Sequence, residues 1–192
     1  GRDWLDNHLR FGLLSRVAAW LGSEASSLDW VPEVIHCNDW QTALIPVLLK
    51  TDYRDAQEFE RTASIFTIHN MAFQGQFWHW DMLLTGLDWK YFNWRQLEFF
   101  GNLNLLKAGI VFSDLITTVS PTYAREIQTP EFGYGLHGVL SGRRDDLVGI
   151  LNGCDTAIWN PRTDPHLPVH YDDLTFPEGK AAAKAELQKR LN

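Results

Sequence analysis

Four short apolar segments, spaced about 30 residues or more apart, constrain the fold of this chain most strongly. Short runs rich in branched apolar side chains are typical of buried strands. The intervals between them have room for helices, as right-handed βαβ units require. The sequence therefore predicts an α/β fold with a Rossmann-like parallel sheet and flanking helices. The predicted strands cover residues 34–37, 64–68, 115–119 and 147–151.

Each predicted strand is followed at once by polar residues that a strand does not choose for packing. In an open parallel sheet, the carboxyl ends of the strands lie along one edge, where ligands bind. The four polar clusters are therefore expected to converge on one rim. They comprise residues 38–40, 69–70, 120–122 and 152–155.

The segment over residues 67–77 carries the most informative of these side chains. It presents His69 and Asn70 at the end of a predicted strand and continues into a Gln-Gly turn. A single histidine at a strand end is somewhat more often structural than catalytic. The adjacent Asn70 and the converging Asp39 favour function, so His69 is the candidate catalytic residue.

An apolar stripe near the start of the chain predicts a helix that faces the core. Its members recur at every fourth residue, as one face of a helix requires. They are Leu5, Leu9, Leu13, Val17 and Leu21.

Two further helices have cap signals at the predicted rim. Asp39 is expected to cap a helix over residues 40–49, because its carboxylate can accept from an unpaired amide of the first turn. Ser120 is expected to cap residues 121–127 in the same way, with a proline at the first helical position.

The aromatic segment that holds Trp78, Trp80, Trp89 and Trp94 has two interpretations. Flat aromatic rings pack on the apolar faces of sugars, but large aromatic side chains also fill cores. We expect most of these four rings to lie in the core. Trp40 differs because it follows Asp39 at the predicted rim.

Composition excludes several partners. The formal charge of the 192-residue chain is −7 and its basic residues are scattered, so it has no electrostatic footprint for nucleic acid or an anionic membrane. Two distant cysteines, no signal peptide and no apolar run of about 18 residues indicate a cytoplasmic protein. Because the chain starts with glycine and stops within a helical pattern, we expect a piece of a longer polypeptide.

Other chemistries find little support. Residues 133–138 match the G-x-G-x-x-G fingerprint of dinucleotide sites, but no strand runs directly into the glycines. We expect them instead to let a loop pass close to a sugar or phosphate. The histidines lack metal-binding spacing, and the motifs of serine hydrolases and P-loop proteins are absent, so no metal or cofactor is expected.

The sheet domain is predicted to cover residues 1–155. Prolines among polar residues then indicate an irregular connection, and residues 175–178 have the form of a capping box before a helix over residues 179–192. Residues 156–192 are therefore expected to be a connection and the start of a linker helix.

These motifs, taken in order, resemble the bacterial glycogen synthase and plant starch synthase family. The resemblance covers nearly the whole chain and is highly specific. The matching segments are residues 36–43, 67–70, 73–75, 107–109, 118–127, 133–136 and 151–153.

The resemblance implies a two-domain glycosyltransferase of the GT-B type, with two Rossmann-like domains facing across a cleft. Such enzymes transfer glucose from ADP-glucose to the non-reducing end of an α-1,4-glucan, with retention of configuration and without a metal. The chain would be the later part of the N-terminal, acceptor-side domain, and the missing remainder of its own polypeptide would be its partner.

Five residues carry over from the family motifs. His69 resembles the histidine beside the transferred glucose, near its 6-hydroxyl. Asp39, Trp40, Asn70 and Asn152 resemble cleft residues that contact glucose or the acceptor.

Two departures from the family pattern limit the activity expected of this chain alone. The Lys-x-Gly-Gly-Leu donor loop and the C-terminal domain, which bind the diphosphate, are absent from it. The isolated chain is therefore expected to be inactive, and to associate through an uncovered sheet edge.

Two alternatives stay open at this point. One is a GT-B enzyme that uses another sugar nucleotide, because the contacts that distinguish ADP from UDP are expected outside this chain. The other is a non-catalytic glucan-binding module, which the aromatic content supports.

Overall fold

The computed structural model describes residues 4–191. It divides into two compact units, Gly1–Leu151 and Asn152–Asn192, which are described separately.

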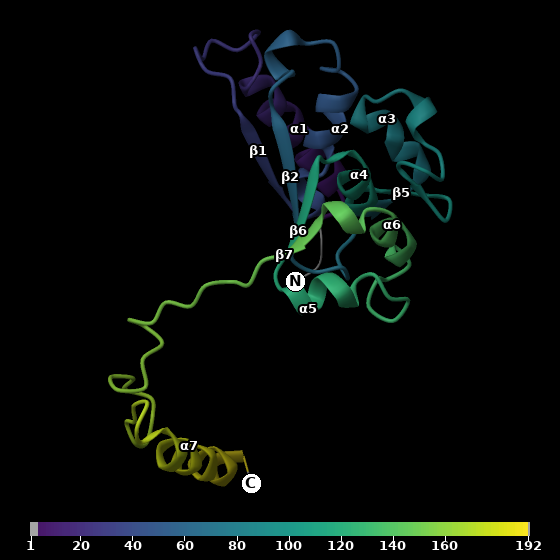
Figure 1. Ribbon diagram of the computed structural model, residues 1–192. Coiled ribbons are helices and arrows are strands. Elements are labelled where there is room, and N and C mark those ends of the chain that lie inside the picture. The colour runs from purple at the N-terminus through teal and green to yellow at the C-terminus, as the bar shows by residue number, and fades with distance from the viewer. Residues whose placement is uncertain (1–3, 192) are drawn as a thin grey trace. The chain divides into compact units, whose positions relative to one another are not determined.

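A four-stranded parallel sheet forms the centre of the first unit, as the sequence predicted (Figure 1). The strand order is β1-β2-β6-β7, and the register places Cys37 beside Phe66 and Phe66 beside Ile116. The α/β class is thereby confirmed. The strands are β1 (Val34–Asn38), β2 (Ala63–Ile68), β6 (Leu115–Thr118) and β7 (Leu147–Gly149).

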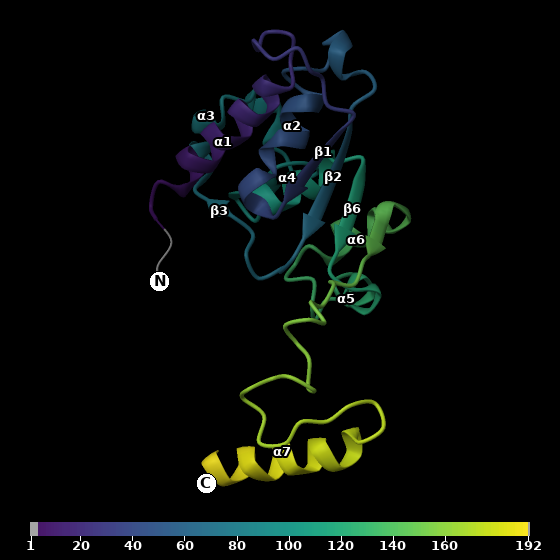
Figure 2. The ribbon, with the colours of Figure 1, turned by 90° about the vertical axis from the view of Figure 1, so that its left-hand side faces the viewer.

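Helices α1 (Asn7–Leu21), α2 (Leu44–Lys50) and α4 (Leu105–Phe112) pack together beside the sheet (Figure 2). Helix α4 meets β2 at Gly109, where any Cβ atom would overlap the ring of Phe66. A glycine there lets the helix approach the strand directly, so the core forms between them.

An insertion between β2 and β6 forms a small antiparallel sheet that the sequence did not predict. Its order is β3-β5-β4, and the buried ammonium of Lys107 donates to the carbonyl oxygens of Trp94 (2.5 Å) and Glu98 (2.6 Å). Burial lowers the pKa of Lys107. The insertion contains β3 (Gln76–Phe77), α3 (Met82–Thr85), β4 (Glu98–Phe99) and β5 (Asn102–Asn104).

After β6 the chain enters α5 (Pro121–Glu126), followed by α6 (His137–Gly142). The predicted cap is confirmed, because Ser120 Oγ accepts from the amide of Tyr123 at 2.9 Å and Pro121 opens the helix. Since α5 starts where β6 ends, it lies at the rim (Figure 1). Single 3₁₀ turns occur at Trp40–Thr42, Gln57–Phe59, His79–Asp81, Trp89–Tyr91 and Arg144–Asp146.

The predicted apolar stripe, whose first member Leu5 precedes α1, does not face the core, so this prediction was wrong. Its five members are all exposed, from 37% for Leu21 to 96% for Leu5. The buried residues of the helix are Asn7, Gly12, Ser15 and Ala19. These small or polar side chains let α1 pack closely on α2, which turns the large apolar side chains outward.

The expectation for the aromatic segment was also wrong. The exposed fraction of these four residues ranges from 38% for Trp89 to 72% for Trp94. Trp80 packs edge-on against Trp78 and Trp89, with ring centres 6.4 and 5.5 Å apart. The rings of Trp78, Trp80 and Trp89 thus form a surface cluster on the insertion.

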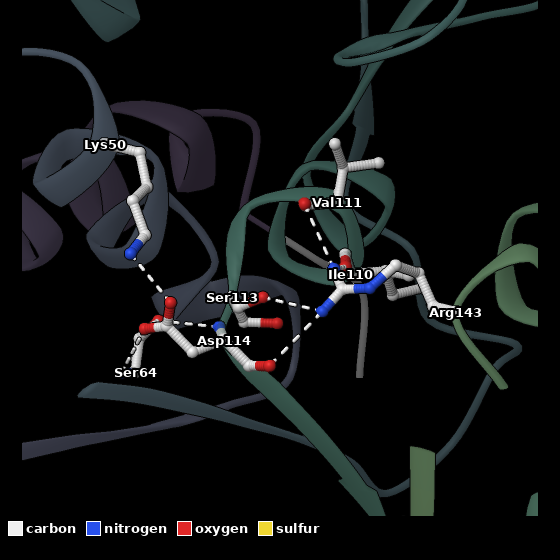
Figure 3. A network of polar contacts seen from close by, with 7 residues as sticks. All are labelled: Lys50, Ser64, Ile110, Val111, Ser113, Asp114 and Arg143. Carbon is white, nitrogen blue, oxygen red and sulfur yellow. Dashed lines mark hydrogen bonds and ion pairs between the residues drawn. The ribbon is translucent and has the colours of Figure 1, made fainter. Parts of the chain in front are cut away.

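Arg143 closes the C-terminal end of α4 (Figure 3). Its guanidinium donates to the carbonyl oxygens of Ile110 (2.6 Å), Val111 (3.1 Å) and Ser113 (2.8 Å). These carbonyls have no partner within the helix, and a cation there also complements the helix dipole.

Asp114 organises the start of β6 beside this cap (Figure 3). Its carboxylate accepts from Lys50 Nζ at 2.7 Å and from the amide and hydroxyl of Ser64 at 2.7 and 2.8 Å. Burial raises the pKa of Asp114, but the hydrogen bonds from Lys50 and Ser64 outweigh it and bring the pKa below its usual 3.8. This network lies at the opposite end of β6 from the rim.

The second unit consists of an irregular segment and the helix α7 (Phe176–Leu191). The capping box is not formed, because the Thr175 hydroxyl bonds to the carboxylate and amide of Asp172 instead. Asn192, the predicted helix end, lies outside the described residues. Within residues 4–191, no helix has the length and apolarity needed to cross a membrane.

Candidate functional site

The ends of β1 and β2 bring Asp39 and His69 together. Asp39 Oδ1 accepts a hydrogen bond from the backbone amide of His69 at 2.8 Å, and the amide of Asp39 donates to Thr67 O at 2.9 Å. Asp39 has a φ of 55°, which is uncommon for a residue other than glycine. This left-handed residue turns the chain sharply at the rim.

Asp39 is therefore not the helix cap that the sequence predicted. The following 3₁₀ turn, Trp40–Thr42, has no side-chain cap bond, and α2 begins only at Leu44. The Asp39 carboxylate instead accepts a hydrogen bond from His69, which follows the neighbouring strand. Sequence spacing does not reveal this pairing.

The imidazole of His69 is held by Asn38, whose Oδ1 lies 3.0 Å from His69 Nε2. An amide oxygen only accepts, so Nε2 is the donor in this contact, and in the neutral ring Nδ1 then carries the lone pair. His69 is exposed at the rim, where Nδ1 can accept from a ligand. The sequence placed Asn38 at the rim but did not identify it as a site residue, because its hydrogen bond is to His69, which follows the neighbouring strand.

Asn70 shapes the turn that follows His69. Its Oδ1 accepts from the amide of Ala72 at 2.9 Å in an Asx turn, and Asn70 is exposed at the rim. The next amide, from Met71, donates to the hydroxyl of Tyr123 at 3.0 Å, and Tyr123 belongs to α5. The turn is thus stabilised by the Asn70 side chain within it and by Tyr123 of the neighbouring helix α5.

The ring of Trp40 is buried, with 6% exposed. It packs edge-on against Phe11 and Phe77, with ring centres 5.1 and 5.6 Å apart. Gly75, at φ 59°, lies so close that a Cβ atom there would be 2.5 Å from the ring. In this structure Trp40 therefore supports the turn from below, although the sequence placed it at the rim.

Asn152 is an exposed residue of the second unit. The structure brings together Asp39, His69 and Asn70, with Asn38 in addition, all from the first unit.

The predicted glycine loop precedes α6 and follows α5, with no strand leading directly into it. Tyr134 and Gly135 have φ values of 48° and 85°. Gly135 also touches the ring of Phe99, where a Cβ atom would lie 2.8 Å away. This arrangement does not have the strand–turn–helix geometry of a dinucleotide site.

A cavity of about 270 Å³ lies behind the His69 turn. It is lined by Trp4, Asn7, Trp40 and residues 72–77, and His69 is not among them. The rim, rather than this cavity, therefore presents the candidate catalytic group.

The rim residues of the first unit offer amide, hydroxyl and imidazole groups and one carboxylate, that of Asp39. Among residues 4–191 there is no group of three His, Cys, Asp or Glu side chains that could hold a metal ion. Cys37 is buried within β1, and burial raises its pKa to about 12, so its thiol stays protonated. Such groups suit a polar ligand that is bound through its hydroxyls.

The fold and the rim define a Rossmann-like α/β domain with a ligand site at the carboxyl ends of its strands. Residues 1–142 match the family described as the starch synthase catalytic domain. The chain belongs to this family.

Similar proteins cover the whole chain. It is 50% identical over 191 residues to a glycogen synthase of Nitrosomonas eutropha and 49% identical to one of Marinobacter nauticus, each match covering 100% of this chain. The match covers 37% and 38% of those two proteins, so the chain spans little more than a third of their length.

A solved structure has the same fold. The catalytic domain of starch synthase IV from Arabidopsis thaliana, bound to ADP and acarbose, matches with a TM-score of 0.75 and 35% identity. The match covers 99% of this chain and 38% of that one. The predicted resemblance and GT-B fold class are thereby confirmed.

Proposed function

We propose that the complete gene product transfers glucose from ADP-glucose to the non-reducing end of an α-1,4-glucan, with retention of configuration. This chain supplies the acceptor-side wall of the cleft. The observation that carries the proposal is the placement of His69, which Asn38 and Asp39 hold at the end of β2 in a chain 50% identical to a glycogen synthase.

In the proposed reaction, the bond between glucose C1 and the diphosphate breaks, and C1 bonds to the 4-oxygen of the acceptor. ADP leaves with the electron pair, and the proton of the acceptor hydroxyl passes to the leaving phosphate. Because the transition state resembles an oxocarbenium ion, the protein acts mainly through positioning and electrostatics.

Each rim residue has a role in this proposal. His69 Nδ1 accepts from a hydroxyl of the transferred glucose, and the NH₂ group of Asn70 donates to the sugar. Asp39 positions His69 through its amide, and Trp40 supports the turn beneath. Asn152 of the Leu-Asn-Gly segment is a further sugar contact in this proposal.

The partners we propose are ADP-glucose and an α-1,4-glucan, with no metal, cofactor, nucleic acid or membrane. The ADP and acarbose bound to the Arabidopsis relative support a nucleotide and a sugar-like ligand. Two free cysteines suit a reducing compartment, and we place the protein in the cytoplasm.

The test is glucose transfer to a glycogen primer by the complete gene product, with labelled ADP-glucose and UDP-glucose in competition. We expect incorporation from ADP-glucose and none by the 192-residue chain alone. A preference for UDP-glucose would favour another GT-B enzyme, and glucan binding without transfer would favour a binding module. Transfer by the isolated chain would show that the diphosphate contacts are not needed.

A further inference from the structure

Gln74 uses its whole carboxamide in hydrogen bonds beneath the His69 turn, and it is only 7% exposed. Its NH₂ group donates to the carbonyl oxygens of Met71 (3.3 Å) and Tyr134 (3.1 Å). Its Oε1 accepts from the side-chain amides of Gln76 (2.9 Å) and Asn104 (2.7 Å). Two donors and two acceptor positions are all that an amide side chain has, so its orientation is fixed.

This side chain joins two loops that are far apart in sequence. Met71 lies two residues after His69, whereas Tyr134 lies 60 residues beyond Gln74, in the loop before α6. The amide of Met71 is bound in turn by Tyr123 of α5. Gln74 therefore sets the distance between the His69 turn and the Tyr134 loop.

The Tyr134 loop presents an aromatic ring in an unfavourable backbone conformation. A bulky residue at φ 48° is strained, and such strain persists only where neighbouring contacts enforce it. The bond from Gln74 to Tyr134 O and the contact of Gly135 with Phe99 are two such contacts. They leave the side chain of Tyr134 57% exposed.

We propose that Gln74 is a positioning residue that places Tyr134 relative to His69, and that the exposed Tyr134 ring packs on glucosyl units of the acceptor glucan. This inference rests on the proposed function. A flat ring with few rotatable bonds fits the apolar face of a pyranose, and its hydroxyl can remain in water.

A purely structural role for Gln74 makes a different prediction. Loss of a buried, fully bonded amide would then lower stability and change the KM values of both substrates alike. A positioning role predicts an effect on the glucan that depends on the Tyr134 ring.

The experiment is a double-mutant cycle in the complete gene product, with kcat and the KM values for glucan and ADP-glucose measured well below the unfolding temperature of each variant. We expect Tyr134→Ala to raise the glucan KM about five- to tenfold, with little change in the ADP-glucose KM. Gln74→Met should act in the same direction, and the double variant should be no worse than Tyr134→Ala. Tyr134→Phe, which keeps the ring, should restore most of the affinity.

Trp30→Ala is the control. Trp30 is an exposed ring of the first unit, 60% exposed, that lies far from the Tyr134 loop in sequence and makes no hydrogen bond to Gln74. Its removal should leave the glucan KM unchanged. Independent, multiplicative effects of the Gln74 and Tyr134 variants, or an unchanged glucan KM in Tyr134→Ala, would overturn the proposal.

Hydrogen exchange in the 192-residue chain tests the link between Gln74 and Tyr134 independently of enzymatic activity. In Gln74→Met, or in Gln74→Glu if the first variant does not fold, amides of residues 133–136 should exchange faster while β2 stays protected. Unchanged exchange would overturn the positioning role. A wild-type gene product that transfers no glucose would instead remove the proposed function, and with it the acceptor role of Tyr134.

Discussion

The carboxylate of Asp39 accepts a hydrogen bond from the backbone amide of His69, with 2.8 Å between Asp39 Oδ1 and His69 N. The bond joins the residue after β1 to the residue after β2. It fixes where the imidazole leaves the sheet, so the two residues act as one unit at the rim.

Replacing Asp39 tests whether this residue positions His69 or only caps a helix. Asp39→Ala leaves the His69 amide without its partner, and we expect turnover of the complete gene product to fall more than tenfold. Stability should fall by about 1 kcal/mol, the usual value of one such bond. Asp39→Asn keeps an acceptor oxygen and should retain most of the activity. Equal losses in the two variants would show that the negative charge, not the bond to His69, is what matters.

Arg143→Ala should destabilise the first unit without disturbing the rim. It removes four bonds to carbonyl oxygens at and just after the end of α4 and the ion pair with Asp146, and we expect a loss of about 2 kcal/mol in the free energy of unfolding. Arg143→Lys should recover only part of this, because an ammonium lacks the planar fork. Urea denaturation of the 192-residue chain measures both variants. A loss below about 0.5 kcal/mol, the range of ordinary surface changes, would contradict the assigned role.

The network at Asp114 predicts a dependence of stability on pH. Because its pKa in the folded chain lies below 3.8, the carboxylate stabilises the fold at pH values above 3.8, and this contribution is lost as the pH falls through the lowered pKa. Asp114→Asn should therefore be less stable than wild type at neutral pH, with a smaller difference in acid. Denaturation curves at several pH values would show this convergence, and a difference independent of pH would argue against it.

The orientation of α1 gives a prediction about packing. Leu13→Gln alters a side chain that is 65% exposed and should change the free energy of unfolding by less than about 0.5 kcal/mol. Ala19→Leu adds volume at a fully buried position and should cost about 1–3 kcal/mol. Both are measured by urea denaturation of the 192-residue chain. The reverse order would mean that the apolar stripe faces the core after all.

The parallel sheet could be predicted from the sequence, because short apolar runs at this spacing are typical of parallel strands. The convergence of Asp39 and His69 follows from the same pattern, since strand ends meet at one edge. The orientation of α1 could not be predicted, because periodicity identifies an apolar face but not whether a closer packing of Gly12, Ser15 and Ala19 outweighs it.

The side-chain contacts at the rim also could not be predicted from the sequence. The Asp39 carboxylate had a local capping partner within reach, and only the strand register shows that it bonds to His69 instead. Likewise, the burial of Trp40 depends on Phe11 and Phe77, which come from distant segments. Hydrogen-bond partners across a sheet require the register as well as the pattern.

The most direct test of the account is the turnover of His69→Ala in the complete gene product, beside His79→Ala as a control on the insertion. We expect kcat for glucose transfer from ADP-glucose to fall about 100-fold in His69→Ala, the usual cost of one group that stabilises a transition state. The unfolding transition should stay where it is, because His69 is exposed. Turnover close to that of wild type in a folded His69→Ala protein would contradict the central claim that His69 lies at the reacting glucose.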